Sequence, residues 1–121
     1  MNIIVQGSHL EITRSIQDYL AKRLRGIEKL VSSNAKIQAD LGKTSNHHKH
    51  GDIFKAEFNI YDNGQYTRVM REGDDLYAAI DLAKDEAYEA LSTKKDKKQS
   101  LYRKGALKIK QFFKAGNIAA L

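Results

Sequence analysis

A tight turn between two segments predicted to be strands constrains the fold of this chain more than any other feature. Asp62-Asn63-Gly64 separates residues 53–61 from residues 65–72. Asn-Gly tolerates the positive φ angles of a type I′ turn, which is the usual short connection between two antiparallel strands. Residues 53–61 alternate between apolar and polar side chains, as expected of a strand with one buried face. The sequence therefore predicts a β-hairpin here.

Four further segments complete the predicted architecture. Residues 2–6 form a short apolar run, and residues 35–42 alternate like the strands of the hairpin. Thr13 is a suitable N-cap for a helix over residues 13–31, and a second helix is predicted over residues 74–100. The order strand, helix, three strands, helix predicts an α+β two-layer sandwich, in which two helices pack on one face of a four-stranded sheet. The last three strands are expected to form an antiparallel meander.

Each predicted helix has one apolar face. In the first helix, apolar residues recur at steps of three and four. In the second, a wheel of 100° per residue shows an apolar stripe rich in alanine, so this helix can lie close to the sheet or to the first helix. The apolar residues are Ile16, Leu20, Leu24, Ile27 and Val31 in the first helix and Leu76, Ile80, Ala83, Ala87, Ala90 and Leu91 in the second.

The polar faces of the two helices differ in charge. The first helix has a mostly cationic second stripe, and Arg23 lies off it. The second helix has an acidic side that we expect to face water. The stripe contains Arg14, Asp18, Lys22, Arg25 and Lys29, and the acidic side contains Asp81, Asp85, Glu86 and Glu89.

One shoulder of the second helix interleaves aromatic rings with cations, in Tyr77, Lys84, Tyr88 and Lys95. Such a mixture is typical of RNA-binding surfaces, because lysine neutralises phosphate and an aromatic ring stacks on an unpaired base. The alternative for each tyrosine is an amphipathic residue at the edge of the core.

The net charge of +6 is concentrated at one end of the chain. Residues 94–114 contain nine Lys and Arg side chains and one acid, whereas the rest of the chain contains 12 basic and 14 acidic side chains. The second helix ends in Lys94-Lys95-Asp96-Lys97-Lys98, which is more positive charge than is needed to compensate a helix dipole. Clustered positive charge of this kind favours a polyanionic partner such as nucleic acid.

Composition excludes several function classes. The 121 residues contain no cysteine, so neither a disulfide framework nor thiolate chemistry is available, which fits the cytoplasm. We see neither a signal peptide at the start nor an apolar run as long as a membrane span, and expect no membrane partner. His47, His48 and His50 lie in a predicted polar loop over residues 43–51, without the spacing of a recognised metal site. We therefore predict no enzymatic activity, no cofactor and no functional metal.

The start of the second helix also carries a family resemblance. The run Gly73-Asp74-Asp75-Leu76-Tyr77-Ala78-Ala79-Ile80-Asp81, followed by a lysine-rich end, resembles the last helix of the ribosome hibernation promoting factors, a family that includes ribosome-associated inhibitor A (protein Y). The opening Asn2-Ile3-Ile4-Val5-Gln6-Gly7 and Leu10-Glu11-Ile12-Thr13 are similar to that family's first strand and helix start. The resemblance covers roughly residues 1–98.

The resemblance implies both a fold and a function. Members resemble double-stranded-RNA-binding domains in topology, bind the small ribosomal subunit between head and body, and overlap the tRNA A and P sites and the mRNA path. It implies a cytoplasmic protein of stress and stationary phase whose partners are the 30S subunit, the 70S ribosome and its 16S rRNA, with a ribosome-dimerising factor as a further partner. The implied RNA-binding residues are Arg14, Lys22, Arg23, Arg25, Lys29, Tyr77, Lys84, Lys94, Lys95, Lys97 and Lys98.

The chain departs from the family pattern at two places. Arg14 follows Thr13 where the family often has proline, and Glu89-Ala90 stands where it often has Arg-Gln, so an anion replaces a cation there. The family's inhibitor form has an acidic tail and its long form a second domain, so the basic residues 101–121 are more similar to the short form.

Residues 101–121 leave three alternatives open. The segment is a basic extension with apolar residues at helical spacing, and could form a short amphipathic helix that packs on the domain, docks on the ribosome, or remains partly disordered. Two alternative functions also stay open, a double-stranded-RNA binder unrelated to ribosomes and a protein-interaction module. Because one core accounts for the apolar faces, we expect the free protein to be a monomer.

Overall fold

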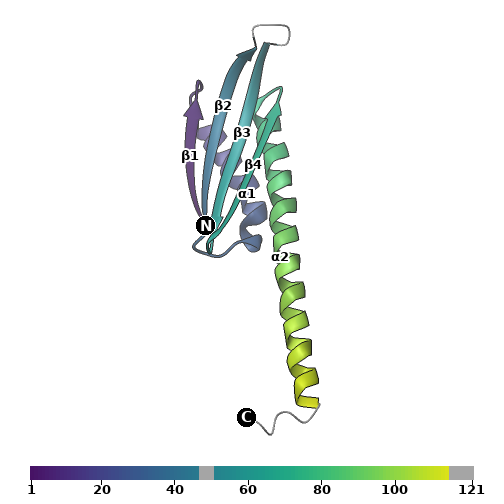
Figure 1. The fold of residues 1–121 in the computed structure, drawn as a ribbon. Helices are drawn as coiled ribbons and strands as arrows, with labels where there is room; N and C mark the ends of the chain where they lie inside the picture. The colour runs from purple at the N-terminus through teal and green to yellow at the C-terminus, as the bar shows by residue number, and fades with distance from the viewer. Residues whose placement is uncertain (47–50, 115–121) are drawn as a thin grey trace. The chain divides into compact units, whose positions relative to one another are not determined.

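The computed structural model describes the backbone of residues 1–46 and 51–114, and the side chains of residues 1–44 and 51–101. Its elements follow the predicted order, and together they form the α+β architecture expected from the sequence (Figure 1). The strands and helices are β1 (Asn2–Ser8), α1 (Arg14–Leu24), the 3₁₀ helix η1 (Arg25–Leu30), β2 (Lys36–Asn46), β3 (Gly51–Asp62), β4 (Gln65–Gly73) and α2 (Leu76–Lys114).

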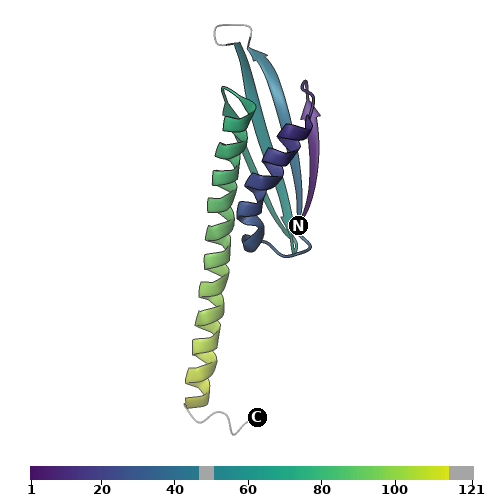
Figure 2. The same cartoon turned by 180° about the vertical axis from the view of Figure 1, so that it is seen from behind.

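The four strands form one sheet in the order β1-β2-β3-β4. β1 runs parallel to β2, with Ile3 opposite Ile37. β2, β3 and β4 form the predicted antiparallel meander, in which Ala39 lies opposite Phe58 and Phe58 opposite Val69. Figure 2 shows α1 and the first part of α2 side by side on the same face of the sheet. This confirms the predicted two-layer arrangement.

The Asn63-Gly64 turn and its flanking strands agree with the sequence analysis, whereas the predicted loop over residues 43–51 is too long. Asn63 and Gly64 both have positive φ, at 50° and 78°, as a type I′ turn requires. β2 continues to Asn46, with Lys43 opposite Phe54. The prediction missed this extension because these residues are polar, and they are strand because β3 supplies backbone partners for them.

The first helix is shorter than predicted. The Thr13 side chain accepts a hydrogen bond from the Ile16 backbone N–H at 3.2 Å, which confirms Thr13 as the N-cap. The α-helix ends at Leu24, however, and the chain continues as the tighter 3₁₀ helix η1. Gly26, whose residue type destabilises a helix interior, lies at the start of this change.

The second helix is longer than predicted. Asp75 caps its start, because its carboxylate accepts from the Ala78 backbone N–H at 2.8 Å. Gly73 precedes it in a tight approach, since a Cβ there would lie 2.9 Å from the Ala79 nitrogen. α2 then continues past Ser100 to Lys114. No proline interrupts it, so nothing in the local sequence requires an end at Ser100.

The chain divides into two compact units, Met1–Leu91 and Ser92–Leu121. The first contains the sheet, α1, η1 and α2 as far as Leu91, and the second contains the remainder of α2. All the buried core residues among the described side chains belong to the first unit. None of the described helices is long and apolar enough to cross a membrane.

The core lies between the sheet and the two helices. Leu20, Leu24 and Ile27 are fully buried, as the apolar face of the first helix predicts. From α2, the core takes Leu76, Ile80 and Leu91 together with small alanines, which confirms that this helix packs closely. The buried alanines of α2 are Ala79, Ala83 and Ala87.

Candidate nucleic-acid interface

The outer side of α1 and η1 presents the cationic stripe predicted from the sequence. Arg14, Lys22, Arg25 and Lys29 are all exposed. Arg14 is 4.0 Å from Asp18, but both side chains are largely in solvent, so this pair contributes little to stability. Four cations along one exposed surface are suited to contacts with successive phosphates.

Arg23 lies in a different environment, between the two helices. Its Nε donates to Asp81 Oδ1 at 2.6 Å, and the Tyr19 hydroxyl donates to the same oxygen, also at 2.6 Å. The guanidinium carbon is 5.8 Å from the centre of the Tyr19 ring. The hydrogen bond to Asp81 raises the pKa of Arg23, and the bond to the same carboxylate raises the pKa of Tyr19. The sequence-predicted cation is therefore held by α2.

Tyr77 and Lys84 extend this contact along α2. The Tyr77 and Tyr19 rings meet edge to face, with centroids 4.8 Å apart, and Tyr77 remains 43% exposed. Lys84 Nζ lies 5.4 Å from the centre of the Tyr88 ring and 3.7 Å from Asp85. We call the residues along this line the helix seam. Its members are Tyr19, Arg23 and Gly26 from α1 and η1, and Tyr77, Asp81, Lys84 and Tyr88 from α2.

The seam depends on Gly26. A Cβ on this residue would lie 2.9 Å from Lys84 Cε, so the lysine side chain crosses the position that a side chain would occupy. Lys84 is consequently only 20% exposed. Tyr88 packs partly against the core, which agrees with the edge-of-core alternative for this residue, while Tyr77 does not join that cluster.

The acidic side of α2 is only partly in water, so the wheel prediction is wrong for two of its four residues. Asp85 and Glu89 are exposed, whereas Asp81 and Glu86 are half-buried. A wheel of an isolated helix places residues by angle alone and does not contain the neighbouring elements. In the folded chain, α1 reaches Asp81 and β4 reaches Glu86.

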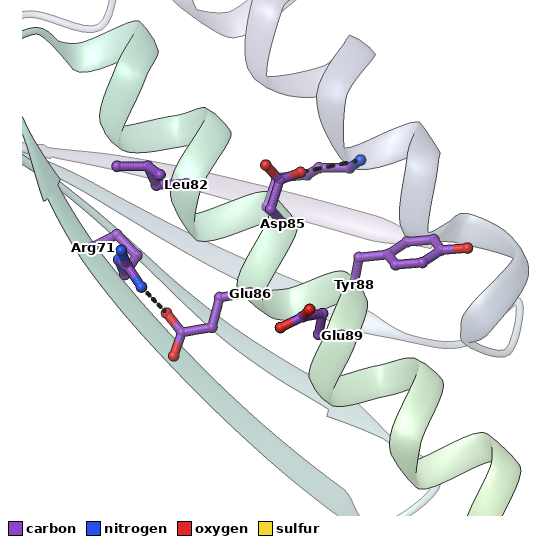
Figure 3. A pocket seen from close by; sticks show the side chains of 7 residues that line it. Arg71, Leu82, Asp85, Glu86, Tyr88 and Glu89 are labelled. Atoms are coloured by element: carbon purple, nitrogen blue, oxygen red, sulfur yellow. Dashed lines mark ion pairs between the residues drawn. The ribbon is translucent and has the colours of Figure 1, made fainter.

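An open hollow of about 560 Å³ lies along α2 (Figure 3). Arg71 of β4 approaches Glu86 to 3.7 Å on one flank of the helix, and Tyr88 lies on the other flank. Its lining contains three acidic side chains, Asp85, Glu86 and Glu89, and two cations, Arg71 and Lys84. Because these acidic side chains repel phosphate, the hollow is poorly suited to bind a polyanion. Of the predicted RNA-binding residues, only Lys84 lines it.

Lys94, Lys95, Lys97 and Lys98 belong to the second unit and are all exposed. At 100° per residue, the four lysines fall within an arc of about 160°, and Asp96 lies on the opposite side of the helix. This arrangement gives α2 one strongly cationic face over these residues.

The metal prediction concerns residues that lie partly outside the described structure. His47, His48 and His50 fall in residues 47–50, which are not described. Asp52, the adjacent carboxylate, forms an ion pair with Lys43 at 3.0 Å. Among the residues that are described, no group of three or more His, Asp or Glu side chains is placed to hold a metal ion.

A family model matches residues 3–99, and it is described as sigma 54 modulation protein / S30EA ribosomal protein. The chain belongs to this family. The description is that of a family of modulation and ribosomal proteins, which supports the non-enzymatic prediction. The match spans the four strands of the sheet, α1, the part of α2 that belongs to the seam, and the lysine run.

Individual relatives agree with this assignment. A ribosome hibernation promotion factor of Picosynechococcus sp. is 33% identical over 98 residues, which cover 80% of this chain. This chain aligns with only 50% of that relative's length. A ribosome hibernation promoting factor of Pseudomonas putida is 26% identical over 106 residues, covering 88% of this chain and 98% of the relative.

Solved structures show the same fold. The N-terminal domain of Thermus thermophilus Protein Y superposes with a TM-score of 0.64 and 32% identity, covering 75% of this chain and 96% of the domain. A ribosomal subunit interface protein from Coxiella burnetii gives a TM-score of 0.65 at 21% identity, covering 79% and 99%. The S30EA fold thus comprises most of the chain.

The sequence analysis did not identify Tyr19 and Asp81 as partners of Arg23 at the candidate interface. A usable signal was present, because Tyr19 and Arg23 are four residues apart, as are Tyr77 and Asp81. Lys84 and Tyr88 repeat the spacing. Side chains four residues apart lie on the same face of a helix. One of these tyrosine–charge pairs is on the first helix and two are on the second, so each helix has a face on which tyrosines and charged residues are neighbours. Which faces meet is given only by the fold.

Proposed function

We propose that this protein is a ribosome hibernation factor that binds the small ribosomal subunit near the A and P sites, through 16S rRNA, and sterically blocks tRNA and mRNA. The observation that carries the proposal is the placement of cations on exposed helical surfaces of an S30EA domain. The α1 stripe and the run Lys94–Lys98 supply this charge. The names of the relatives support the ribosomal assignment.

The proposed mechanism requires only binding. Exposed lysine and arginine side chains neutralise RNA phosphates and release condensed counterions, which favours association at low salt. Tyr77, which is exposed and whose ring meets the Tyr19 ring edge to face, offers a ring for stacking on an unpaired base or a ribose. The bound domain excludes other ligands by occupying their volume, so no bond is made or broken.

The proposal includes the protein's state and location. We expect a free monomer in the cytoplasm that joins the 30S subunit or the 70S ribosome, because one core buries the apolar faces of both helices. A ribosome-dimerising factor is a further proposed partner.

Sucrose-gradient sedimentation with purified ribosomes tests the proposal. We expect the protein to co-sediment with 30S and 70S particles at 50 mM salt. With about six to ten phosphate contacts, its affinity should fall by ~10³–10⁵ between 50 and 200 mM salt. A generic RNA duplex serves as competitor, and the same protein should inhibit translation in vitro.

Two results would overturn the proposal. Binding that does not depend on salt would remove the rRNA contacts from the mechanism. Complete displacement from the ribosome by an equimolar generic duplex would favour the alternative of a general double-stranded-RNA binder.

A further inference from the structure

Asp81 is an anion in the middle of a surface that we propose to face RNA. Its side chain is 33% exposed, and it is the one acidic residue of α2 that belongs to the seam as defined above. A carboxylate at this position repels phosphate, so charge alone gives it no role in binding a polyanion. Its contacts indicate what it does instead.

The Asp81 carboxylate holds two side chains of α1 at one oxygen. Arg23 Nε and the Tyr19 hydroxyl both donate to Oδ1 at 2.6 Å. The guanidinium also lies beside the Tyr19 ring, and that ring is fixed in turn by its edge-to-face contact with Tyr77. The arginine is therefore restrained along its Nε edge and beside one aromatic face.

The restrained guanidinium keeps its second edge for an external ligand. The hydrogen bond to Asp81 uses Nε, while Nη1 and Nη2 form the other edge. Two parallel N–H donors match the geometry of two phosphate oxygens, and arginine binds phosphate in this bidentate manner. The Arg23 side chain is 39% exposed, so it is accessible from solvent.

We infer that Asp81 and Tyr19 are positioning residues, which hold the guanidinium of Arg23 so that its terminal nitrogens bind one phosphate of an RNA backbone. This inference rests on the proposed function and specifies one contact within it. A flexible arginine must lose its side-chain freedom when it binds, whereas an arginine already fixed by the fold has lost most of it before the RNA arrives.

The alternative is that the ion pair only joins α1 to α2. Both interpretations predict that removing Asp81 lowers stability, but they predict opposite changes in binding. If the pair is only a clamp, removing a negative charge strengthens attraction to phosphate. If Asp81 positions Arg23, the same change weakens binding although the protein becomes more positive.

The experiment compares Asp81→Asn with Asp85→Asn, measured as affinity for 30S subunits at several salt concentrations. Both changes remove one carboxylate charge from α2, and Asp85 is an exposed residue whose ion pair with Lys84 is 3.7 Å long. We expect Asp81→Asn to weaken binding by about 3- to 10-fold, from the freedom regained by one long side chain. Asp85→Asn should leave binding unchanged or strengthen it.

Arg23→Gln tests whether the effect passes through Arg23. This variant should weaken binding and reduce the salt slope by about one. In the Arg23→Gln background, Asp81→Asn should no longer weaken binding, since there is no guanidinium left to position, and the lost negative charge alone should leave the affinity unchanged or raise it. Tyr19→Phe keeps the ring and removes the donor to Asp81, and should weaken binding less than Asp81→Asn. Thermal unfolding of each variant checks the fold. If Asp81→Asn does not fold, Tyr19→Phe is compared with the wild type: weaker binding supports the positioning role, and wild-type binding overturns it.

The outcomes separate this inference from the proposed function. Wild-type protein that fails to bind 30S subunits in a salt-dependent manner overturns the proposed function. Wild-type protein that binds, together with an Asp81→Asn variant that binds as tightly as Asp85→Asn or more tightly, overturns the positioning role alone.

Discussion

The helix seam and the lysine run Lys94–Lys98 are both cationic, but they hold their charge in different ways. In the seam, Arg23 bonds to Asp81, and Lys84 lies across Gly26 and beside the Tyr88 ring. In the run, four exposed lysines lie on one side of a helix and Asp96 on the other. The seam therefore holds two positive charges at defined positions, whereas the run places four positive charges close together.

This difference follows from what lies beneath each region. The seam lies over a core in which Ala83 and Ala87 are fully buried, so α2 packs closely in the first unit. Among the described side chains, no core residue follows Leu91. Fixed charges favour selectivity for a particular arrangement of phosphates, and numerous charges favour affinity that depends on salt.

Reversing the run is expected to have the largest effect on binding. Replacing Lys94, Lys95, Lys97 and Lys98 with Glu should weaken ribosome binding by at least about 100-fold and lower the salt slope by about 3 to 4, because four phosphate contacts are lost. Sedimentation and equilibrium binding at several salt concentrations measure both quantities.

The matched control for this variant replaces the same four lysines with arginine, which retains the charge and should retain binding. The unfolding temperature of both variants should match the wild type, since the run contributes nothing to the described core. Wild-type affinity in the glutamate variant would show that the run is not part of the binding surface.

Overpacking beneath the seam should have the next largest effect, and it changes no charge. Ala83→Leu adds three carbon atoms to a fully buried position and should destabilise the protein by about 1–3 kcal/mol. Thermal unfolding should show a loss of several degrees. Ribosome binding at 25 °C should weaken less than in the glutamate variant, because the lysine run remains.

Ala90→Leu is the matched control for Ala83→Leu, since it makes the same substitution in α2 at a half-buried position. It should change the unfolding temperature little. If both leucine variants bind and unfold alike, close packing under the seam has no part in ordering its charges.

The sequence predicted the elements of this fold because their signals are local. The apolar periods of the helices, the alternation of the strands and the Asn63-Gly64 turn each depend on neighbouring residues. The predictions that were wrong concern tertiary partners. Residues 43–46 are strand because β3 pairs with them. Asp81 and Glu86 are half-buried because α1 contacts Asp81 and β4 contacts Glu86.

The candidate site divides in the same way. Exposure of the α1 stripe and of the lysine run was predictable, since both follow from a charge pattern on a helix. The contacts of Arg23 were not predictable, because its position depends on an aspartate 58 residues away. A single chain contains the spacing of both residues but not the packing that brings their helices together.

Asp40→Asn should have the smallest effect on ribosome binding. It removes a negative charge outside the seam, and so tests whether binding depends on where a charge is placed or only on the total charge. Asp40 is on β2 directly opposite Glu57 of β3, and it lies between the buried Ala39 and Leu41, so it points to the sheet face that the two seam helices do not cover. Burial raises the pKa of Asp40, and repulsion from Glu57 raises it further, so the folded state binds this proton more tightly than the unfolded state. Ionisation of Asp40 therefore costs stability, and the cost develops as pH rises above the usual value of 3.8.

The variant should raise the unfolding temperature at pH 7 by on the order of 1–3 °C, as expected for relief of one like-charge pair across two strands. The gain should disappear below about pH 3.8, where Asp40 is protonated in both states.

Glu57→Gln should have the opposite effect and lower the unfolding temperature at pH 7. Burial opposes ionisation of Glu57, but hydrogen bonds from Arg68 and Asn59 outweigh it and lower its pKa, so its charge stabilises at pH 7 and that contribution is lost on acidification. Ribosome binding by Asp40→Asn should equal that of the wild type, because Asp40 is on the sheet face away from the seam and belongs neither to the seam nor to the lysine run. A change in affinity as large as that of Asp81→Asn would mean that total charge, and not its placement in the seam, controls binding.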